Sequence, residues 1–205
     1  IDNLVYKEFV DVTIPNSPDI KKHEKQLIDT SMEYMKLPFT RIPGGEKDSV
    51  ETFQTTSKTG DAAWGKAIGI VDVSAATVLA WFFSSCSNER LAEHERSNGN
   101  VLRSERTIPN SRSKLVSFVK TFPNPIANRL FHVWLVWDKI SDYNGHETYV
   151  LALADREEYP DKELVSSAED TDTTRRSTAI GTTKATPSIV GKTKGVYLLE
   201  VLSNN

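Results

Sequence analysis

The chain has 205 residues, of which 38% are apolar and 26% are charged, and its formal net charge at pH 7 is −3. This length suits one sizeable domain, and this composition excludes disorder along the whole chain. The pI of about 5.9 gives no overall basic field for nucleic acid or an anionic membrane, although a local basic patch stays open.

The single cysteine, Cys86, cannot form an internal disulfide, and its neighbours indicate a buried thiol in a reducing compartment. The longest apolar run, Ala75–Phe83, is too short to cross a bilayer, and no signal peptide is recognisable. We therefore expect a cytoplasmic location. The first residue is Ile1, so we expect a fragment of a longer chain.

The first half of the chain predicts a helix, two strands and a second helix. Ser17 is expected to cap the first helix, with Pro18 in its first turn and apolar residues following at helical spacing. The stretches "SVETFQTT" and "WGKAIGIVDV" (residues 49–56 and 64–73) predict strands. Ser74 is expected to cap a helix over "SAATVLAWFFSSC", which is apolar all round and therefore needs cover on every side.

The second half predicts a run of antiparallel strands after a short charged helix. The strands are expected in residues 98–108, 113–122, 130–140, 142–155 and 191–202, with a turn at Asn144-Gly145. Residues 166–188 are rich in Ser and Thr and nearly free of bulky apolar groups. They predict a mobile loop that has room for one short edge strand.

The stretch from Gly60 to Lys66 matches most of a phosphate-binding loop, G-x-x-x-x-G-K. That motif needs a Ser or Thr after the lysine to bind magnesium, and a helix whose N-terminus faces the phosphate. Position 67 is Ala, and the residues that follow are strand-like. The sequence therefore predicts a turn into a strand, with Trp64 in a structural role.

Other signals for catalysis are weak. Two Ser-x-x-Lys pairs, Ser111/Lys114 and Ser117/Lys120, fall on predicted strands, whereas that chemistry needs the serine at the start of a helix. The four histidines have no metal-ligand spacing, and Cys86 has no histidine close in sequence. We predict no catalytic residue, no metal site and no cofactor.

The stretch "FHVWLVW" (residues 131–137) is apolar on both strand parities. A strand with one face in water alternates apolar and polar residues, so both faces of this strand need cover. One face of an antiparallel sheet commonly packs on a helix. The other face is expected either to be solid core or to line an apolar cavity, and these patterns do not distinguish the two.

The order of elements resembles the START-type lipid-binding domain. The residues that carry the resemblance are "VDVSAATVLAWF" (residues 71–82), where a strand leads into a helix, and "PNPIANRLF" (residues 123–131), a proline turn before a strand. The resemblance extends over residues 27–202, a START-like domain that contains the Ser/Thr-rich loop. Residues 1–26 are then an N-terminal extension or linker.

The resemblance implies an α+β, helix-grip fold, in which a curved antiparallel sheet and helices surround an apolar cavity. It implies non-enzymatic binding of a single lipid (a sterol, a phospholipid or a ceramide-like lipid) for transfer or sensing, with transient membrane contact and no nucleic acid. Arg129 is expected to make a structural hydrogen bond or ion pair. The expected cavity residues are Val116, Phe118, Phe131, Val133, Leu135, Trp137, Tyr149 and Leu151.

The sequence differs from the family pattern in two places. The family ends with one more strand and a long helix, whereas this sequence stops at "LLEVLSNN", which again favours a fragment. Positions 116 and 135 are apolar, so a lipid head group is expected to meet His132, Lys120 or Tyr149. The alternative is a regulatory or protein-interaction module with a filled core and no ligand. An enzyme of the wider superfamily is a third, weaker alternative.

Overall fold

The structure is a computed structural model that describes residues 7, 9–15, 18–43, 50–56, 63–84, 90–93, 96, 100–107, 112–120, 122–123, 125–143, 146–161 and 189–201. The predictions for Cys86, for the turn at residues 144–145 and for the loop at residues 166–188 lie outside these residues. The helical elements with described bounds are η1 (Phe9–Thr13), α2 (Lys22–Glu33), η2 (Tyr34–Lys36), α3 (Ala75–Phe83) and η3 (Arg156–Glu158), and residues 90–93 are also helical.

Two sheets form the framework. The large sheet has the order β4 (Asn100–Thr107), β5 (Ser113–Lys120), β6 (Arg129–Tyr143), β7 (His146–Asp155) and β9 (Gly195–Glu200), and its neighbours in this order pair antiparallel. The short strand β8 (Ile189–Gly191) pairs parallel with the start of β6. The small sheet joins β1 (Thr40–Arg41), β2 (Glu51–Thr56) and β3 (Ala63–Ile68), all antiparallel.

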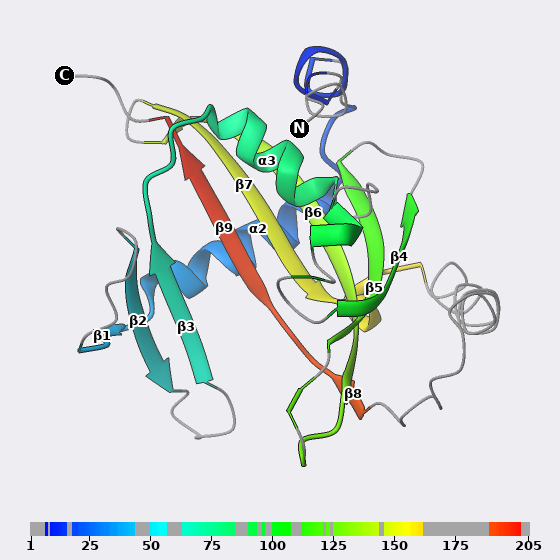
Figure 1. The fold of residues 1–205 in the computed structure, drawn as a ribbon. Coiled ribbons are helices and arrows are strands. Elements are labelled where there is room, and N and C mark those ends of the chain that lie inside the picture. Colours follow the sequence, from blue (N-terminus) through cyan, green and yellow to red (C-terminus); the bar gives the residue numbers. More distant parts are fainter. Residues whose placement is uncertain are drawn as a thin grey trace.

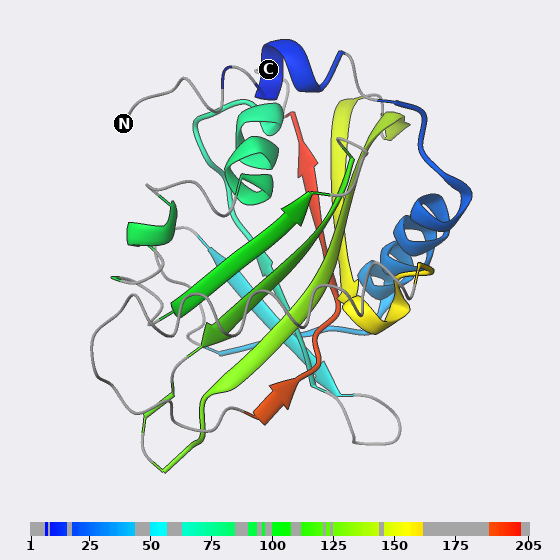
Figure 2. The ribbon, with the colours of Figure 1, turned by 90° about the vertical axis from the view of Figure 1, so that its right-hand side faces the viewer.

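The large sheet has a helix on each face (Figures 1 and 2). We call the face toward α3 and η1 the inner face, and the face toward α2 the outer face. The α+β class expected from the sequence is confirmed, because mainly antiparallel strands pack with helices and the sheet does not close into a barrel. The apolar cavity that the resemblance implies stays a prediction.

Each face has its own apolar cluster. Strand alternation sends every second residue of β6 to the same side, so Val133, Leu135 and Trp137 join the inner cluster while Trp134 and Val136 join the outer one. Both clusters are buried, as the two apolar parities of residues 131–137 predicted. In the outer cluster, Leu27 and Ile28 of α2 pack against the sheet.

Helix α2 begins later than the sequence predicted. Its N-cap is Lys21, whose backbone N–H donates to the Glu24 carboxylate at 2.9 Å, and Glu24 is buried. This capping box gives the backbone N–H at the start of the helix a hydrogen-bond acceptor. The prediction that the helix begins at Ser17 and Pro18 is therefore wrong. Helix α2 runs across the expected domain boundary between residues 26 and 27.

Most other predicted elements are present. Ser74 caps α3 as expected, because its side-chain oxygen accepts from the backbone N–H of Thr77 at 3.1 Å. The strand predicted to reach residue 73 ends at Ile68, and the residues between it and α3 are exposed. Strands β1 and β8 were not predicted, since they have two and three residues and carry little pattern.

Candidate functional site

All eight residues predicted to line a cavity lie on the inner face. Val116 pairs with Val133, Phe118 with Phe131, and Trp137 with Leu151 across neighbouring strands. Residues that pair directly share a face, so β5, β6 and β7 bring these side chains together. The eight residues are Val116, Phe118, Phe131, Val133, Leu135, Trp137, Tyr149 and Leu151.

The eight side chains differ in how well they are covered. Six of them are at most 7% exposed, with Trp137 at 0%. Phe118 and Phe131 are half-buried and stack on each other, with ring centroids 5.1 Å apart and planes 24° apart. The ring of Phe131 also lies against the backbone of Gly191 in β8, where a side chain would have no room. The apolar face is therefore continuous from Tyr149 and Leu151 to Phe131.

Helix α3 covers the middle of the inner face. It turns three alanines, Ala75, Ala76 and Ala80, into the inner cluster together with Leu79 and Phe83. Alanine side chains let a helix lie close to a sheet, and Leu79 then fills the contact completely, since it is 0% exposed. Phe82 fixes the helix at the edge of the sheet by stacking on Tyr197 of β9, with centroids 4.4 Å apart.

The N-terminal turn η1 covers the end of the inner face beside α3 (Figures 1 and 2). Phe9 is 6% exposed, and its ring centroid lies 5.7 Å from Phe83 and 5.7 Å from Trp137. Val10 and Ile14 pack on the same cluster. No sequence pattern pointed to Phe9, because it precedes the resemblance and lies in one short turn.

A buried lysine lies on the inner face. Lys114 is 3% exposed, its ammonium donates to the carbonyl oxygen of Phe83, and its Nζ lies 4.3 Å from the centroid of the Phe83 ring. The carbonyl end of a helix carries partial negative charge, which favours a cation there. Sequence reasoning missed this side chain, although Lys114 has the same strand parity as Val116 and Phe118.

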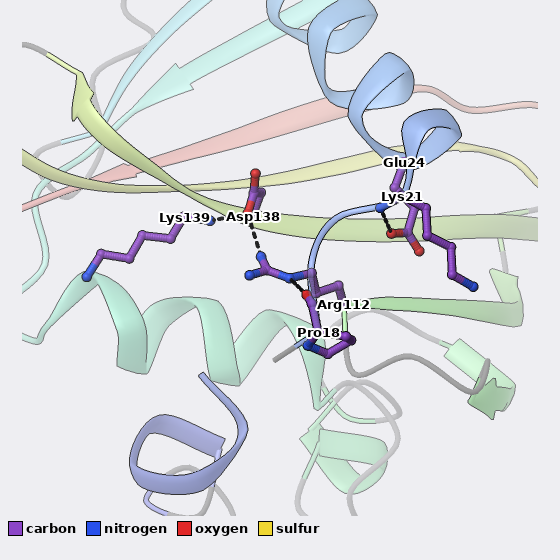
Figure 3. Close-up of polar contacts among 6 residues, drawn as sticks. All are labelled: Pro18, Lys21, Glu24, Arg112, Asp138 and Lys139. Atoms are coloured by element: carbon purple, nitrogen blue, oxygen red, sulfur yellow. Dashed lines mark hydrogen bonds and ion pairs between the residues drawn. The ribbon is translucent and has the colours of Figure 1, made fainter. Parts of the chain in front are cut away.

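A second cation lies beside Trp137. Arg112 donates to the carboxylate of Asp138 and to the carbonyl oxygen of Pro18, which ties the chain before α2 to the sheet (Figure 3). Its guanidinium carbon lies 4.8 Å from the centroid of the Trp137 ring. Two positive side chains thus approach the two rings that Phe9 contacts.

Tyr149 ends in a polar network at the edge of the inner face. Its hydroxyl donates to the Glu147 carboxylate at 2.8 Å, and Lys139 Nζ lies 2.8 Å from the other carboxylate oxygen. The hydrogen bond from Lys139, followed by that from Tyr149, lowers the pKa of Glu147. Burial, with Glu147 close by, raises the pKa of Tyr149, so its hydroxyl stays protonated and can donate.

The three residues expected to meet a head group lie in different places. Tyr149 lies on the inner face. His132 has the opposite strand parity, and its Nδ1 lies 2.8 Å from the hydroxyl of Ser117. Lys120 follows Phe118 on the inner parity but is exposed at the end of β5, 5.7 Å from the Phe122 ring. The structure thus brings Tyr149, but not His132, to the apolar face.

The two residues expected to be structural make local contacts. Arg129 Nη1 donates to the carbonyl oxygen of Ala127 at 3.2 Å, at the start of β6. The ring of Trp64 in β3 packs at a tilt against that of Tyr34 in η2, with ring centroids 4.5 Å apart and planes 38° apart. Gly65 and Lys66 lie inside strand β3, so the strand expected in place of a phosphate loop is present there.

The described residues contain no group of three His, Cys, Asp or Glu side chains that could hold a metal ion. No helix within the described ranges is long and apolar enough to span a membrane. The candidate site is therefore the apolar inner face with its two adjacent cations and the hydroxyl of Tyr149.

Comparisons with known proteins found matches among solved structures, where ten chains match. No family model matches the chain, and no curated protein matches it. Among solved structures, it is similar to the human StarD13 (DLC2) lipid transfer and protein localization domain, with a TM-score of 0.46 and 15% identity over 66% of this chain. The chain spans 66% of that structure's length. This likeness is too distant to carry a ligand or a function to this chain.

Proposed function

We propose that the chain binds a single lipid on the inner face of the large sheet and transfers or senses it without covalent chemistry. The lipid classes we expect are sterols, phospholipids and ceramide-like lipids. Access to them requires transient contact with a membrane, and we expect no nucleic-acid partner. A cytoplasmic location stays a prediction.

The observation that supports this proposal most strongly is the gathering of all eight predicted cavity residues on one face under a short helix. Small-molecule sites in proteins are mostly apolar, with a few polar groups that orient the ligand. The inner face has this composition, since a few buried polar side chains, including Tyr149, Lys114 and Asp155, lie among its aliphatic and aromatic side chains. Helix α3 contributes mainly alanines, so it leaves the sheet's own large side chains to shape the contact.

A second candidate function is a regulatory or protein-interaction module whose inner face is permanently filled. The contacts of Phe9 with Phe83 and Trp137 favour it, because they show an aromatic side chain of the chain itself packed against this face. The two candidates differ in one respect that can be measured. Only the lipid-binding module releases a stoichiometric lipid when it unfolds.

The test is native mass spectrometry of the protein purified from a lipid-rich host, followed by denaturation and lipid analysis. We expect one lipid per chain, lost on denaturation. A chain that carries no lipid, and that takes up no fluorescent sterol, ceramide or phospholipid, would support the filled module. A matched control is Leu151→Ala against Val150→Ala, since these neighbours in β7 face the inner and outer clusters. Lipid occupancy is expected to fall for Leu151→Ala alone.

A further inference from the structure

The turn η1 places one aromatic side chain at the end of the inner face, outside the paired strands. Phe9 fills the corner between Phe83, the last residue of α3, and Trp137 of β6. The neighbouring Asp11 and Val12 are exposed, with Val12 at 51%. The turn thus inserts one ring into the apolar cluster while its other side faces water.

The chain just before α2 is held separately. Arg112 bonds both the Pro18 carbonyl and the Asp138 carboxylate, so the lead into α2 stays on the sheet whether or not Phe9 is inserted (Figure 3). Helix α2 is further anchored in the outer cluster through Leu27 and Ile28. Withdrawal of η1 therefore needs no movement of α2, and it uncovers the area under Phe9, Val10 and Ile14.

The surface uncovered in this way has an apolar floor and a cationic side. The floor is formed by the rings of Phe83 and Trp137. Lys114 Nζ approaches the first ring to 4.3 Å, and the Arg112 guanidinium approaches the second to 4.8 Å. An acyl chain suits such a floor, and a carboxylate or phosphate group suits a lysine ammonium in a poorly hydrated place.

We propose that η1 is a removable plug, and that the place of Phe9 binds the chain of a single-chain amphiphile whose anionic head group meets Lys114. This inference rests on the proposed function and names both the ligand class and the segment that competes with it. Phe9 and the ligand exclude each other, since both occupy the corner between Phe83 and Trp137. The ligand binds only the fraction of molecules from which Phe9 has withdrawn, which weakens its apparent affinity.

The first test is fluorescence titration of the full chain with cis-parinaric acid. Phe9→Ala is expected to tighten binding by about tenfold, because the plug no longer competes. The matched control is Val12→Ala, in the same turn but 51% exposed, which is expected to bind like the wild type. Unchanged affinity in Phe9→Ala would overturn the plug.

The second test compares cis-parinaric acid with cis-parinaryl alcohol, which has the same chain and no charge. The wild type is expected to prefer the acid by roughly tenfold or more, which is the size of a hydrogen bond to a charged group. Lys114→Met is expected to lose this preference and still bind the alcohol. Equal affinity of the wild type for the acid and the alcohol would overturn the head-group assignment. This comparison uses the wild-type protein alone, so it does not depend on whether a variant folds.

Further outcomes distinguish a carboxylate ligand from a phosphate ligand, and failure of this inference from failure of the proposed function. Displacement of the probe by oleate at lower concentration than by oleoyl lysophosphatidate supports a carboxylate ligand, and the reverse order supports a phosphate ligand. If neither probe bound the wild type or Phe9→Ala, this inference would be overturned, whereas the proposed function is decided separately by the lipid analysis of the purified protein. Binding of both probes with equal affinity, unaffected by Phe9→Ala, would leave lipid binding in place and overturn only this inference.

Discussion

The two faces of the large sheet each carry a buried apolar cluster but are covered in different ways. The outer face is covered by α2, a helix of 12 residues that starts with a capping box and places Leu27 and Ile28 on the sheet. The inner face is covered by α3, which has nine residues, and by the ring of Phe9 from a separate turn. The outer face is therefore covered by one longer helix with Tyr159 beside it, whereas the inner face is covered by a shorter helix and a separate turn.

This difference separates a structural core from a candidate site. On the outer face, Trp134 donates through Nε1 to the buried hydroxyl of Ser113 at 2.7 Å, and Tyr159 meets its ring edge-on at 5.2 Å. Such specific contacts fix one arrangement. On the inner face, the charged side chain of Lys114 is buried among apolar side chains. Part of this face is covered by the separate turn η1.

The largest expected effect is on the outer face. Trp134→Ala is expected to lower the free energy of unfolding by about 3–5 kcal/mol, since it removes a buried aromatic side chain and leaves a cavity. Urea unfolding followed by circular dichroism measures this loss. Trp134→Phe keeps a ring but leaves the Ser113 hydroxyl without this donor, and is expected to cost about 1–3 kcal/mol. A loss below 1 kcal/mol for Trp134→Ala would show that the outer face is not a packed core.

The next prediction compares neighbours in β7 that face opposite sides. Leu151→Ala is expected to cost about 2–5 kcal/mol and also to weaken lipid binding, because Leu151 is 1% exposed on the inner face. Val150→Ala is expected to cost about 1.5–3 kcal/mol through the outer cluster, with lipid affinity unchanged. Denaturant melts and lipid titrations of both variants measure the two effects. An equal loss of lipid affinity in Leu151→Ala and Val150→Ala would show that lipid binding does not depend on the inner face alone.

A smaller effect is expected at the start of α3. The Ser74 side chain accepts from the Thr77 backbone N–H at 3.1 Å, so Ser74→Ala is expected to destabilise the protein by about 1 kcal/mol. Hydrogen exchange of the α3 amides should rise in this variant more than exchange in α2. If exchange rose equally in both helices, the two covers would open as one unit.

The smallest effect concerns pH. Hydrogen bonds from Lys139 and Tyr149 lower the pKa of Glu147 below the usual 4.5. A carboxylate with a lowered pKa in the folded state stabilises the protein above its unfolded pKa, and this contribution is lost as the pH falls through the folded pKa. Glu147→Gln is therefore expected to be slightly less stable at pH 7, with the difference vanishing well below pH 4.5. Thermal melts of both proteins from pH 7 to pH 3 test this, and a difference that grows toward pH 3 would contradict the sign.

Strand parity made the inner face predictable. Once "FHVWLVW" was placed on a strand, alternation alone assigned Phe131, Val133, Leu135 and Trp137 to one side. The helix cap at Ser74 was predictable for a similar local reason, because Ser is a strong N-cap before an apolar run. The start of α2 was not, since Ser17 and Pro18 gave a start signal and the buried Glu24 overrode it.

Long-range contacts account for what the sequence did not predict. Phe9 is more than 70 residues from Phe83 and more than 120 from Trp137 along the chain, and no periodic pattern connects them. In the sequence Lys114 stands in a Ser-x-x-Lys pair, a motif that carries no information on strand parity. Its burial depends on the carbonyl end of α3, which only the assembled fold brings to it.

The most direct test of the central claim is photocrosslinking of the full chain with a photoactivatable fatty acid and a photoactivatable phospholipid, followed by peptide mass spectrometry. We expect crosslinks on the inner-face residues of β5, β6 and β7 and on α3, at about one label per chain. Crosslinks confined to α2 and the outer face, or the absence of any saturable crosslink, would contradict it.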